Sequence, residues 1–271
     1  MKIGVRAHDF GRKSAVELAA TIRESGFECV QLAMTKAIEG IDSFGMVTEQ
    51  RVDEAAEAFA KVGVEISIYG CYIEPAMEDT ATRLEQVAFF CEGVRLAKRI
   101  NAPIIATETT NFPIGGEGRE AAYLRMRDSV QRMAEAAEKY DVTIGIEPVF
   151  RHTLYSAELT RRLQEEVNSD KLKVVFDPVN MLMPYNADKQ LEIYAQFIET
   201  LGDDIVAMHI KDVTVEGDKF KWANIGDGIV DFSTIMSWLK QHKPDMHLLR
   251  EEVHPESFER DLSAMCELAR G

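Results

Sequence analysis

Acidic or imidazole side chains stand at the ends of four separate apolar runs in the second half of the chain. Glu147 ends VTIGIE, Asp177 ends KVVFD, His209 lies near the end of DIVAMHI, and the pair Glu251 and Glu252 ends HLLREE. One polar residue at a strand end would indicate only a turn. Oxygen and nitrogen donors that recur in this way predict one shared site, provided that the strands carrying them end at the same edge of a sheet.

These side chains could together hold a divalent metal ion. Carboxylates and an imidazole brought into a partly dry cavity repel one another unless they are protonated or neutralised by a cation. A divalent ion is the simplest neutraliser, and this donor set suits Mn²⁺, Mg²⁺, Co²⁺ or Zn²⁺ with an open coordination position. The alternative is that each residue is an unrelated, solvated side chain at a strand end.

The elements that must position these residues alternate along the whole chain, which is typical of βα units and a parallel sheet. Eight strands are predicted, at residues 2–6, 29–33, 65–70, 102–107, 142–147, 173–177, 204–210 and 247–252. Eight amphipathic helices are predicted, at residues 14–25, 51–62, 82–100, 124–140, 158–167, 189–201, 232–241 and 258–270. Without a Pro/Ser-rich linker, this α/β pattern predicts a single (β/α)₈ TIM barrel domain over residues 1–271.

A doubly wound open sheet is the main alternative to the barrel. The segment AHDFGRKSA, after the first strand, lacks the GxGxxG motif of dinucleotide-binding folds. The glycine cluster IGGEG, at 114–118, follows the fourth strand and is most simply a flexible loop, with a phosphate cradle left open. The sequence therefore favours the barrel.

In a barrel the C-terminal strand ends converge on one mouth, and side-chain alternation tests each candidate. The residues expected to face the helices are Val142, Ile144, Ile146, Val174, Phe176, Val206, Met208 and Ile210. The residues expected to face the interior are Thr143, Gly145, Glu147, Asp177, Ala207 and His209. All the candidates on these three strands therefore point toward the same space.

The last strand requires a choice, because Glu251 and Glu252 point to opposite faces. Placing Leu249 inside the barrel puts Glu251 at the mouth, whereas the other register puts Arg250 inside. The first arrangement buries no arginine in the barrel interior, so we predict Glu251 as the site residue.

Composition and charge limit the partners and the location of the protein. The formal net charge is −15, which would repel phosphate backbones and anionic membranes, so we expect neither nucleic acid nor a membrane as a partner. The N-terminus MKIGVRAHDF begins a strand pattern rather than a signal peptide, and the sequence has no run of eighteen apolar residues. We therefore expect a cytoplasmic protein. Its cysteines are too widely spaced for a disulfide framework or a zinc ribbon.

Several motifs match one known superfamily over essentially the whole chain. The segments IEPV, FDPVN, HIKD and ANIGDGIVDF, together with YGCYIEP and ATETT, resemble the xylose isomerase-like TIM barrel superfamily of sugar isomerases, epimerases and endonuclease IV. The sequence resembles in particular the sugar phosphate isomerase/epimerase branch, which includes ketose 3-epimerases. The resemblance implies that Glu147, Asp177, His209 and Glu251 bind one divalent metal ion, and that the two glutamates are also acid/base groups.

The implied activity is isomerisation or epimerisation of a small-molecule sugar, inosose or keto acid. A metal that holds a carbonyl oxygen and a neighbouring hydroxyl acidifies the C–H between them and stabilises a cis-enediolate. Glu147 and Glu251 could then remove and return protons from two sides, and which of them starts is left open. Asp227 in NIGDG stands where a phosphate group would be expected, which favours an unphosphorylated substrate.

Further polar residues near the predicted mouth are candidates for contacting the substrate: Arg6, Glu108, His152, Asn180, Lys211 and His254. Arg6 could bind a carboxylate, phosphate or hydroxyl group, or could form an ion pair with Glu108. His152 resembles a substrate-contacting histidine of relatives with an EPxxxH pattern, or is an ordinary loop residue. Lys211 and Asp212 could orient the substrate or the metal ligands, or could form a salt bridge at the rim.

A DNA repair enzyme and a non-catalytic binding protein are the two alternative functions. The endonuclease IV branch holds three metal ions with extra ligands, but the matching positions here are Asn180, Phe220 and Trp222, which argues against a DNA repair enzyme. A barrel that binds metal and sugar without catalysis, or that serves a larger complex, would not need two acid/base glutamates. Exchange of a substrate C–H for deuterium would separate an enzyme from such a binder. Relatives commonly form homo-oligomers, but the sequence identifies no interface.

Overall fold

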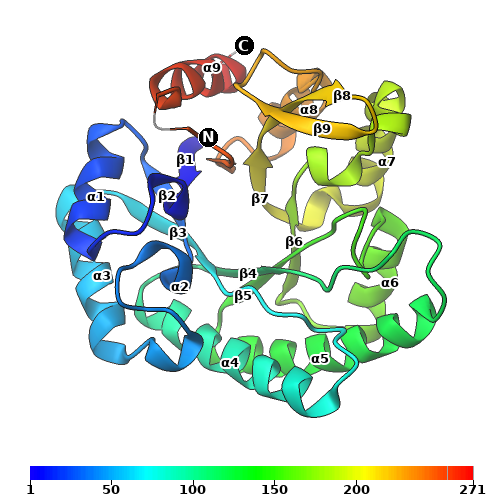
Figure 1. Ribbon diagram of the computed structural model, residues 1–271, viewed down its shortest axis with the longest axis horizontal. Coiled ribbons are helices and arrows are strands. Elements are labelled where there is room, and N and C mark those ends of the chain that lie inside the picture. Colours follow the sequence, from blue (N-terminus) through cyan, green and yellow to red (C-terminus); the bar gives the residue numbers. More distant parts are fainter. Residues whose placement is uncertain (255, 271) are drawn as a thin grey trace.

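The computed structural model describes residues 1–254 and 256–270 and shows a closed barrel of eight parallel strands surrounded by helices (Figure 1). The strands neighbour one another in the order β1-β10-β7-β6-β5-β4-β3-β2. Their bounds are β1 (Lys2–Arg6), β2 (Cys29–Leu32), β3 (Glu65–Gly70), β4 (Ile104–Glu108), β5 (Thr143–Glu147), β6 (Leu172–Phe176), β7 (Ile205–Ile210) and β10 (His247–Arg250). The predicted (β/α)₈ TIM barrel is confirmed.

All eight predicted helices are present, with bounds shifted by a few residues. They are α1 (Ala15–Glu24), α3 (Glu49–Val62), α4 (Thr80–Arg99), α5 (Arg119–Tyr140), α6 (Ala157–Val167), α7 (Gln190–Leu201), α8 (Ser233–His242) and α9 (Phe258–Arg270). Side chains of Ser14, Thr48, Asp79 and Ser156 accept hydrogen bonds from the first turns of α1, α3, α4 and α6, which fixes where these helices begin. Within the described residues, no helix has the length and hydrophobicity to cross a bilayer.

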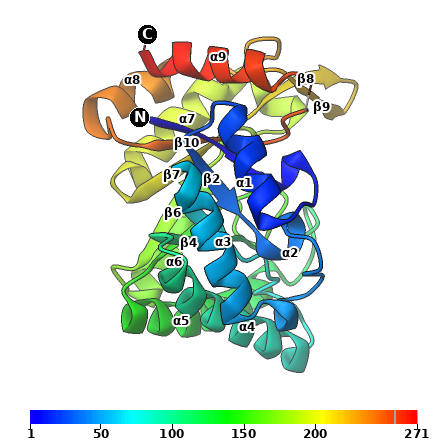
Figure 2. The ribbon, with the colours of Figure 1, turned by 90° about the vertical axis from the view of Figure 1, so that its left-hand side faces the viewer.

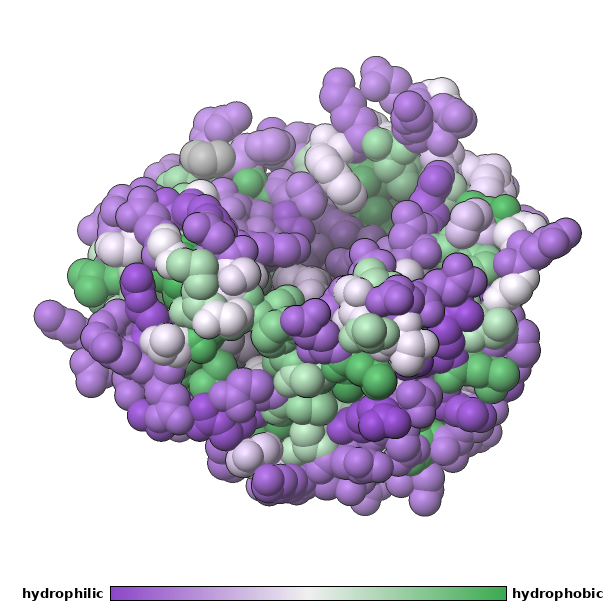
Figure 3. Space-filling view, turned by 60° about the horizontal axis from the view of Figure 1, so that its bottom comes forward, coloured by the Kyte–Doolittle hydropathy of each residue, from purple (hydrophilic) through white to green (hydrophobic). Residues whose placement is uncertain are grey.

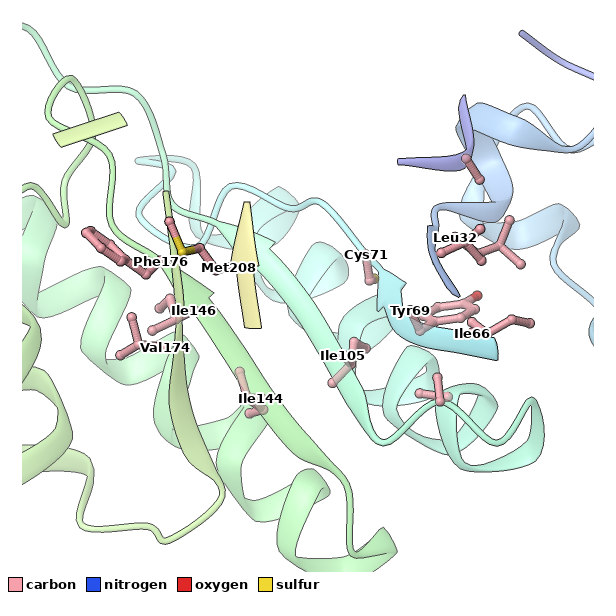
Figure 4. Close-up of a cluster of buried hydrophobic side chains, with 14 of the residues drawn as sticks. Leu32, Ile66, Tyr69, Cys71, Ile105, Ile144, Ile146, Val174, Phe176 and Met208 are labelled. Carbon is pink, nitrogen blue, oxygen red and sulfur yellow. The ribbon is translucent and has the colours of Figure 1, made fainter. Parts of the chain in front are cut away.

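Apolar side chains form two cores, one on each side of the barrel wall. The smaller core fills the interior and consists of Cys29, Ile68, Ile104, Ala106, Val175, Ala207 and Leu249. The larger core lies between the strands and the helices, and Figure 4 shows part of it, including Ile144, Ile146, Val174, Phe176 and Met208. The two faces therefore alternate as the sequence predicts.

Val206 is the exception, because it packs against the interior core rather than the helices. The pairing of β6 with β7 shifts here, since Val174 pairs with Ile205 but Val175 pairs with Ala207. Val206 is thus the extra residue of a bulge, which interrupts strict alternation. The alternation resumes at Ala207, so His209 still faces the barrel interior.

The sequence did not predict the elements that follow several strands. A hairpin formed by β8 (Asp212–Glu216) and β9 (Lys219–Ala223) follows β7 and lies outside the barrel (Figures 1 and 2). A short helix α2 (Met34–Ala37) follows β2, and the described part of the chain also has 3₁₀ helices at Ala7–Phe10, Phe44–Met46, Val179–Met181, Pro184–Lys189 and Gly202–Asp204. Figure 3 shows a face of the molecule that is mainly hydrophilic, with a hollow near its centre.

Asp212 organises the loop that follows the hairpin. Its buried carboxylate accepts hydrogen bonds from the backbone N–H groups of Val213, Gly226, Gly228 and Val230. A Cβ atom at Gly228 would overlap the Asp212 carboxylate, so only glycine fits there. The suggested salt bridge between Lys211 and Asp212 at the rim is therefore wrong, because Asp212 is buried and bonded to the backbone.

A buried ion pair between Arg250 and Asp261 joins the last strand to the last helix. Arg250 Nε donates to Asp261 Oδ2 at 2.8 Å, and both side chains are almost fully buried. Asp261 Oδ1 also accepts from Ile225 N at 2.9 Å, while the Arg250 guanidinium donates to the carbonyl oxygens of Ile210 and Ala223. This pair fastens β10, α9 and the end of the hairpin to one another.

Replacing Asp261 with alanine would leave the Arg250 charge buried without its partner. We expect the free energy of unfolding to fall by about 3–5 kcal/mol in Asp261→Ala, measured by urea denaturation. The control is Arg260→Ala on the same helix, because the pair of Arg260 with Asp227 is exposed. In the control the free energy of unfolding should fall by less than about 1 kcal/mol. Equal losses in the two variants would contradict a structural role for the buried pair.

Candidate metal centre

The residues predicted as metal ligands lie at the ends of four neighbouring strands. Glu147 ends β5, Asp177 follows β6, His209 lies in β7 and Glu251 follows β10, and these strands are adjacent in the order β10-β7-β6-β5. All four side chains are buried, with at most 5% of each residue exposed. Parallel strands that end together thus bring residues more than 100 positions apart into one site.

His209 stands between the two glutamates. Its Nδ1 atom lies 3.2 Å from Glu147 Oε2 and 3.4 Å from Glu251 Oε1. One donor atom each from Glu147, Asp177 and His209 lie within 4.8 Å of one another. Glu251 lies outside this compact triplet and joins the site through its contact with His209.

The unsatisfied atoms of this site fit a cation. His209 Nδ1 is buried and, among the described residues, has no hydrogen-bond partner of good geometry. Asp177 Oδ2 is also buried, and its one close neighbour is the charged Lys211 Nζ at 2.7 Å. Buried polar atoms in this state are costly unless something binds them. Carboxylate oxygens and an imidazole nitrogen are donors for hard-to-borderline divalent ions. The buried Glu147, Asp177 and His209 group could therefore hold a metal ion.

Lys211 supplies positive charge to the same site. Its buried Nζ atom lies 2.7 Å from Asp177 Oδ2 and 3.2 Å from Glu251 Oε2. Burial alone would lower the pKa of Lys211, but the carboxylates of Asp177 and Glu251 outweigh this effect and raise it. Lys211 therefore stays charged inside the site, where its contacts agree with the expected role in orienting metal ligands and not with a salt bridge at the rim. Its contact with the substrate stays a prediction.

Glu251 and Glu252 have different surroundings. Leu249 lies in the interior core, so Glu251 points inward at the mouth, as predicted. Burial would raise the pKa of Glu251, but the charges of His209, Lys211 and Arg6 together lower it. Glu252 adopts a left-handed backbone conformation with φ of 59°, which turns the chain away from the strand.

Arg6 holds both of these glutamates. Its Nη2 atom donates to Glu252 Oε1 at 2.8 Å, and its Nη1 atom lies 3.5 Å from Glu251 Oε2. Asp9 forms a further ion pair with Arg6 at 2.7 Å. The alternative pairing of Arg6 with Glu108 is wrong within the described residues, because the guanidinium faces the end of β10 instead.

Gln31 is a site residue that the sequence analysis missed. It is buried in β2, and its Oε1 atom lies 2.7 Å from His209 Nε2. Its amide nitrogen donates to the hydroxyl of Tyr72. When Nε2–H donates to Gln31, the other nitrogen, Nδ1, is left for the carboxylates and an ion. A polar residue within the apolar segment CVQLA was the available signal.

Asn180 contacts two of the predicted ligands. Its Nδ2 atom donates to Glu147 Oε1 at 2.6 Å, and its backbone N–H donates to Asp177 Oδ1 at 3.1 Å. The Val179 N–H donates to the same oxygen of Asp177 at 2.9 Å. The segment after β6 therefore fixes the orientation of both carboxylates.

Glu108 and His152 lie together beside Glu147. Glu108 is paired with Glu147 in the register of β4 and β5, and its Oε2 atom lies 3.8 Å from His152 Nε2. Burial, and then the charges of Glu147 and Glu251, raise the pKa of Glu108 to about 7. His254, by contrast, is exposed, and its carbonyl oxygen accepts hydrogen bonds from Ser257. Substrate contacts of these residues stay predictions.

The chain matches the family model described as xylose isomerase-like TIM barrel over residues 19–267. It belongs to this family. No curated protein is a significant match to the sequence.

Several solved structures of other proteins resemble this chain over nearly its whole length. A D-tagatose 3-epimerase-like protein has a TM-score of 0.80 and 17% identity, covering 99% of this chain and 97% of that chain. The 3-keto-D-glucoside 4-epimerase YcjR from E. coli has a TM-score of 0.77 and 16% identity, with coverage of 98% and 99%. The IOLI protein with a zinc atom has a TM-score of 0.74 and 17% identity, with coverage of 99% and 96%. At these identities the similarity shows the fold alone.

Proton competition should make metal binding depend on pH. Burial would lower the pKa of His209, but Glu251 and Glu147 outweigh it and raise the pKa to about 9. An ion can bind Nδ1 only after the proton leaves, so falling pH favours the metal-free protein. Below about pH 9 we expect the apparent affinity to fall about tenfold per pH unit, measured against a chromophoric chelator. The fall should steepen below about pH 6, where Asp177 also gains a proton. A flat profile would exclude His209 as a ligand.

Loss of the Gln31 contact should weaken metal binding without removing a ligand. In Gln31→Leu, His209 no longer has a partner that selects its tautomer and orientation. We expect the affinity for a divalent ion to fall about 10- to 100-fold in a chelator competition. Gln50→Leu is the control, because Gln50 is exposed and bonds only within α3. An unchanged affinity in Gln31→Leu would show that this contact does not position His209.

Proposed function

We propose that this protein is a divalent-metal-dependent isomerase or epimerase of a sugar or polyol-derived ketone. The observation that carries the proposal is that Glu147 and Glu251 both approach the same atom, His209 Nδ1. Their strands, β5 and β10, flank β6 and β7 in the barrel. Two carboxylates on either side of one centre are suited to removing and returning a proton on a small substrate.

Four residues would hold the ion: Glu147, Asp177, His209 and Glu251. When bound, the ion would polarise the substrate carbonyl group and stabilise the negative charge of a cis-enediolate. The buried surroundings would strengthen these electrostatic effects, because little water screens the charges. The zinc atom in the name of the IOLI structure supports a metal-binding role for this fold.

Each glutamate has one oxygen held by a neighbour and the other directed at His209. Asn180 donates to Glu147 Oε1, while Lys211 and Arg6 lie near Glu251 Oε2. Both glutamates face His209, but the further neighbour of Glu147 is a neutral amide, whereas Glu251 also lies beside Lys211 and Arg6, cations that lower its pKa. A carboxylate beside cations is a weaker base. We therefore assign removal of the substrate proton to Glu147.

Other residues at the mouth would position the substrate. Glu108, His152 and Lys211 offer donors and acceptors for hydroxyl groups beside the two glutamates. The names of the D-tagatose 3-epimerase-like and YcjR structures, which refer to sugar epimerases, support a sugar as the substrate. The same residues suit isomerisation and epimerisation, since both begin with loss of a proton next to a carbonyl group.

Removal of either acid/base group should strongly slow proton transfer and leave the fold intact. With metal-loaded protein and a panel of ketoses, aldoses and inososes, solvent deuterium should enter one sugar carbon, as seen by NMR. Glu147→Gln and Glu251→Gln should slow this exchange by about 10²- to 10⁴-fold.

The control for this experiment is Glu165→Gln, because Glu165 is exposed on α6, and it should exchange at the wild-type rate. Metal content measured on the same samples should be about one ion per wild-type chain and should fall in Glu147→Gln. If the metal-loaded wild type introduces deuterium into no sugar of the panel, the result would favour a non-catalytic binder over the proposed enzyme.

A further inference from the structure

A groove of about 390 Å³ opens beside the metal centre. Its walls come from the segments that follow β5 and β6 and from the β8–β9 hairpin, which lies near these strand ends (Figure 1). The residues that matter here are Phe150, Asn180, Pro184, Phe220 and Trp222. The volume falls within the range of about 300–1,000 Å³ that is typical of small-molecule sites.

Two contacts join the lining of the groove to the candidate metal centre. Asn180 lines the groove and donates to Glu147. On the hairpin side, Trp222 lines the groove, and its ring centroid lies 5.4 Å from Lys211 Nζ. Since Lys211 also contacts Asp177 and Glu251, the groove lies directly beside the centre.

Three aromatic side chains, Phe150, Phe220 and Trp222, line this groove. Trp222 is 44% exposed although it is one of only two tryptophans in the chain. Phe220 is half-buried and packs against the outer core, and Phe150 packs edge-on against the exposed Tyr185 with a centroid distance of 6.2 Å. A large aromatic side chain left exposed beside a site commonly contacts a ligand.

Charged groups of both signs line the same groove. Arg151 and Lys219 are cationic and Asp218 is anionic, and all three are exposed. A site for a phosphate group would gather cations alone. A site for a purely apolar group would not need charged side chains in its walls. A sugar ring fits both features, because its C–H face packs on an aromatic ring while its hydroxyl groups both donate and accept hydrogen bonds.

We propose that this groove binds a second sugar ring, so that the substrate is a two-ring saccharide rather than a monosaccharide. The reacting sugar would lie at the metal centre, and the second ring would pack on Trp222. This inference rests on the proposed function for the identity of the reacting sugar. It adds the class of substrate and assigns its recognition to the hairpin that follows β7.

The test compares binding of one-ring and two-ring ketoses to the metal-loaded protein by calorimetry. The probes are isomaltulose and leucrose, which carry a glucosyl ring on fructose, and D-fructose itself. We expect at least one two-ring ketose to bind about tenfold more tightly than D-fructose. In Trp222→Ala this preference should disappear, while the affinity for D-fructose changes less than about twofold. Trp222→Tyr should retain most of the preference, because a ring remains.

The matched control is Val215→Ala. Val215 is exposed to a similar extent on the same hairpin but is not part of the groove lining. This variant should bind all three probes like the wild type. If neither two-ring ketose binds more tightly than D-fructose, or if Trp222→Ala weakens both classes equally, the inference is wrong. Absence of deuterium exchange with the preference intact would overturn the proposed function and leave the groove assignment standing.

Discussion

The balance of buried charge at one end of the barrel is the constraint on which the rest of the site depends. Glu147, Asp177 and Glu251 are almost fully buried within contact distance of His209 or Lys211. Buried carboxylates without compensating charge would destabilise the fold by several kcal/mol. The chain meets this constraint with Lys211, with a protonatable His209, and with Arg6 at the edge. Arg6 and His209 lie in barrel strands and Lys211 directly follows β7, so the charge balance depends on barrel closure.

Buried carboxylates away from the centre fix the segments that follow β7 and β10. Asp261 pairs with Arg250 and accepts a hydrogen bond from the backbone of Ile225, while Asp212 accepts hydrogen bonds from three backbone N–H groups of the loop after the hairpin and from that of Val213 in β8. Such charge-assisted bonds fix backbone that has little regular structure. They hold the end of β10 and the base of the hairpin, which carry Glu251 and Trp222. Stability and site geometry therefore share the same interactions.

The sequence was sufficient to predict the barrel, the strands and the face of each strand that carries a donor. Periodicity of two residues places Glu147, Asp177 and His209 on one side of the wall, and the position of Leu249 separates Glu251 from Glu252. Contacts between strands could not be obtained in this way. Gln31 lies 178 positions from His209, and nothing in the local pattern links them. The bulge at Val206 and the hairpin were missed because both depend on pairing partners rather than on local periodicity.

The arrangement of charges explains how one structure could suit the centre with and without a bound cation. Without one, three carboxylates face Lys211 and a protonated His209, because the pKa of His209 is raised to about 9. Binding of a divalent cation would displace the histidine proton, since the same nitrogen must donate its lone pair. The two positive charges of the ion then replace the one charge of the protonated histidine, so the net charge of the site changes by a single unit. Lys211 makes this exchange small, because it neutralises one carboxylate in both states. A lysine beside predicted metal ligands is therefore consistent with a metal site.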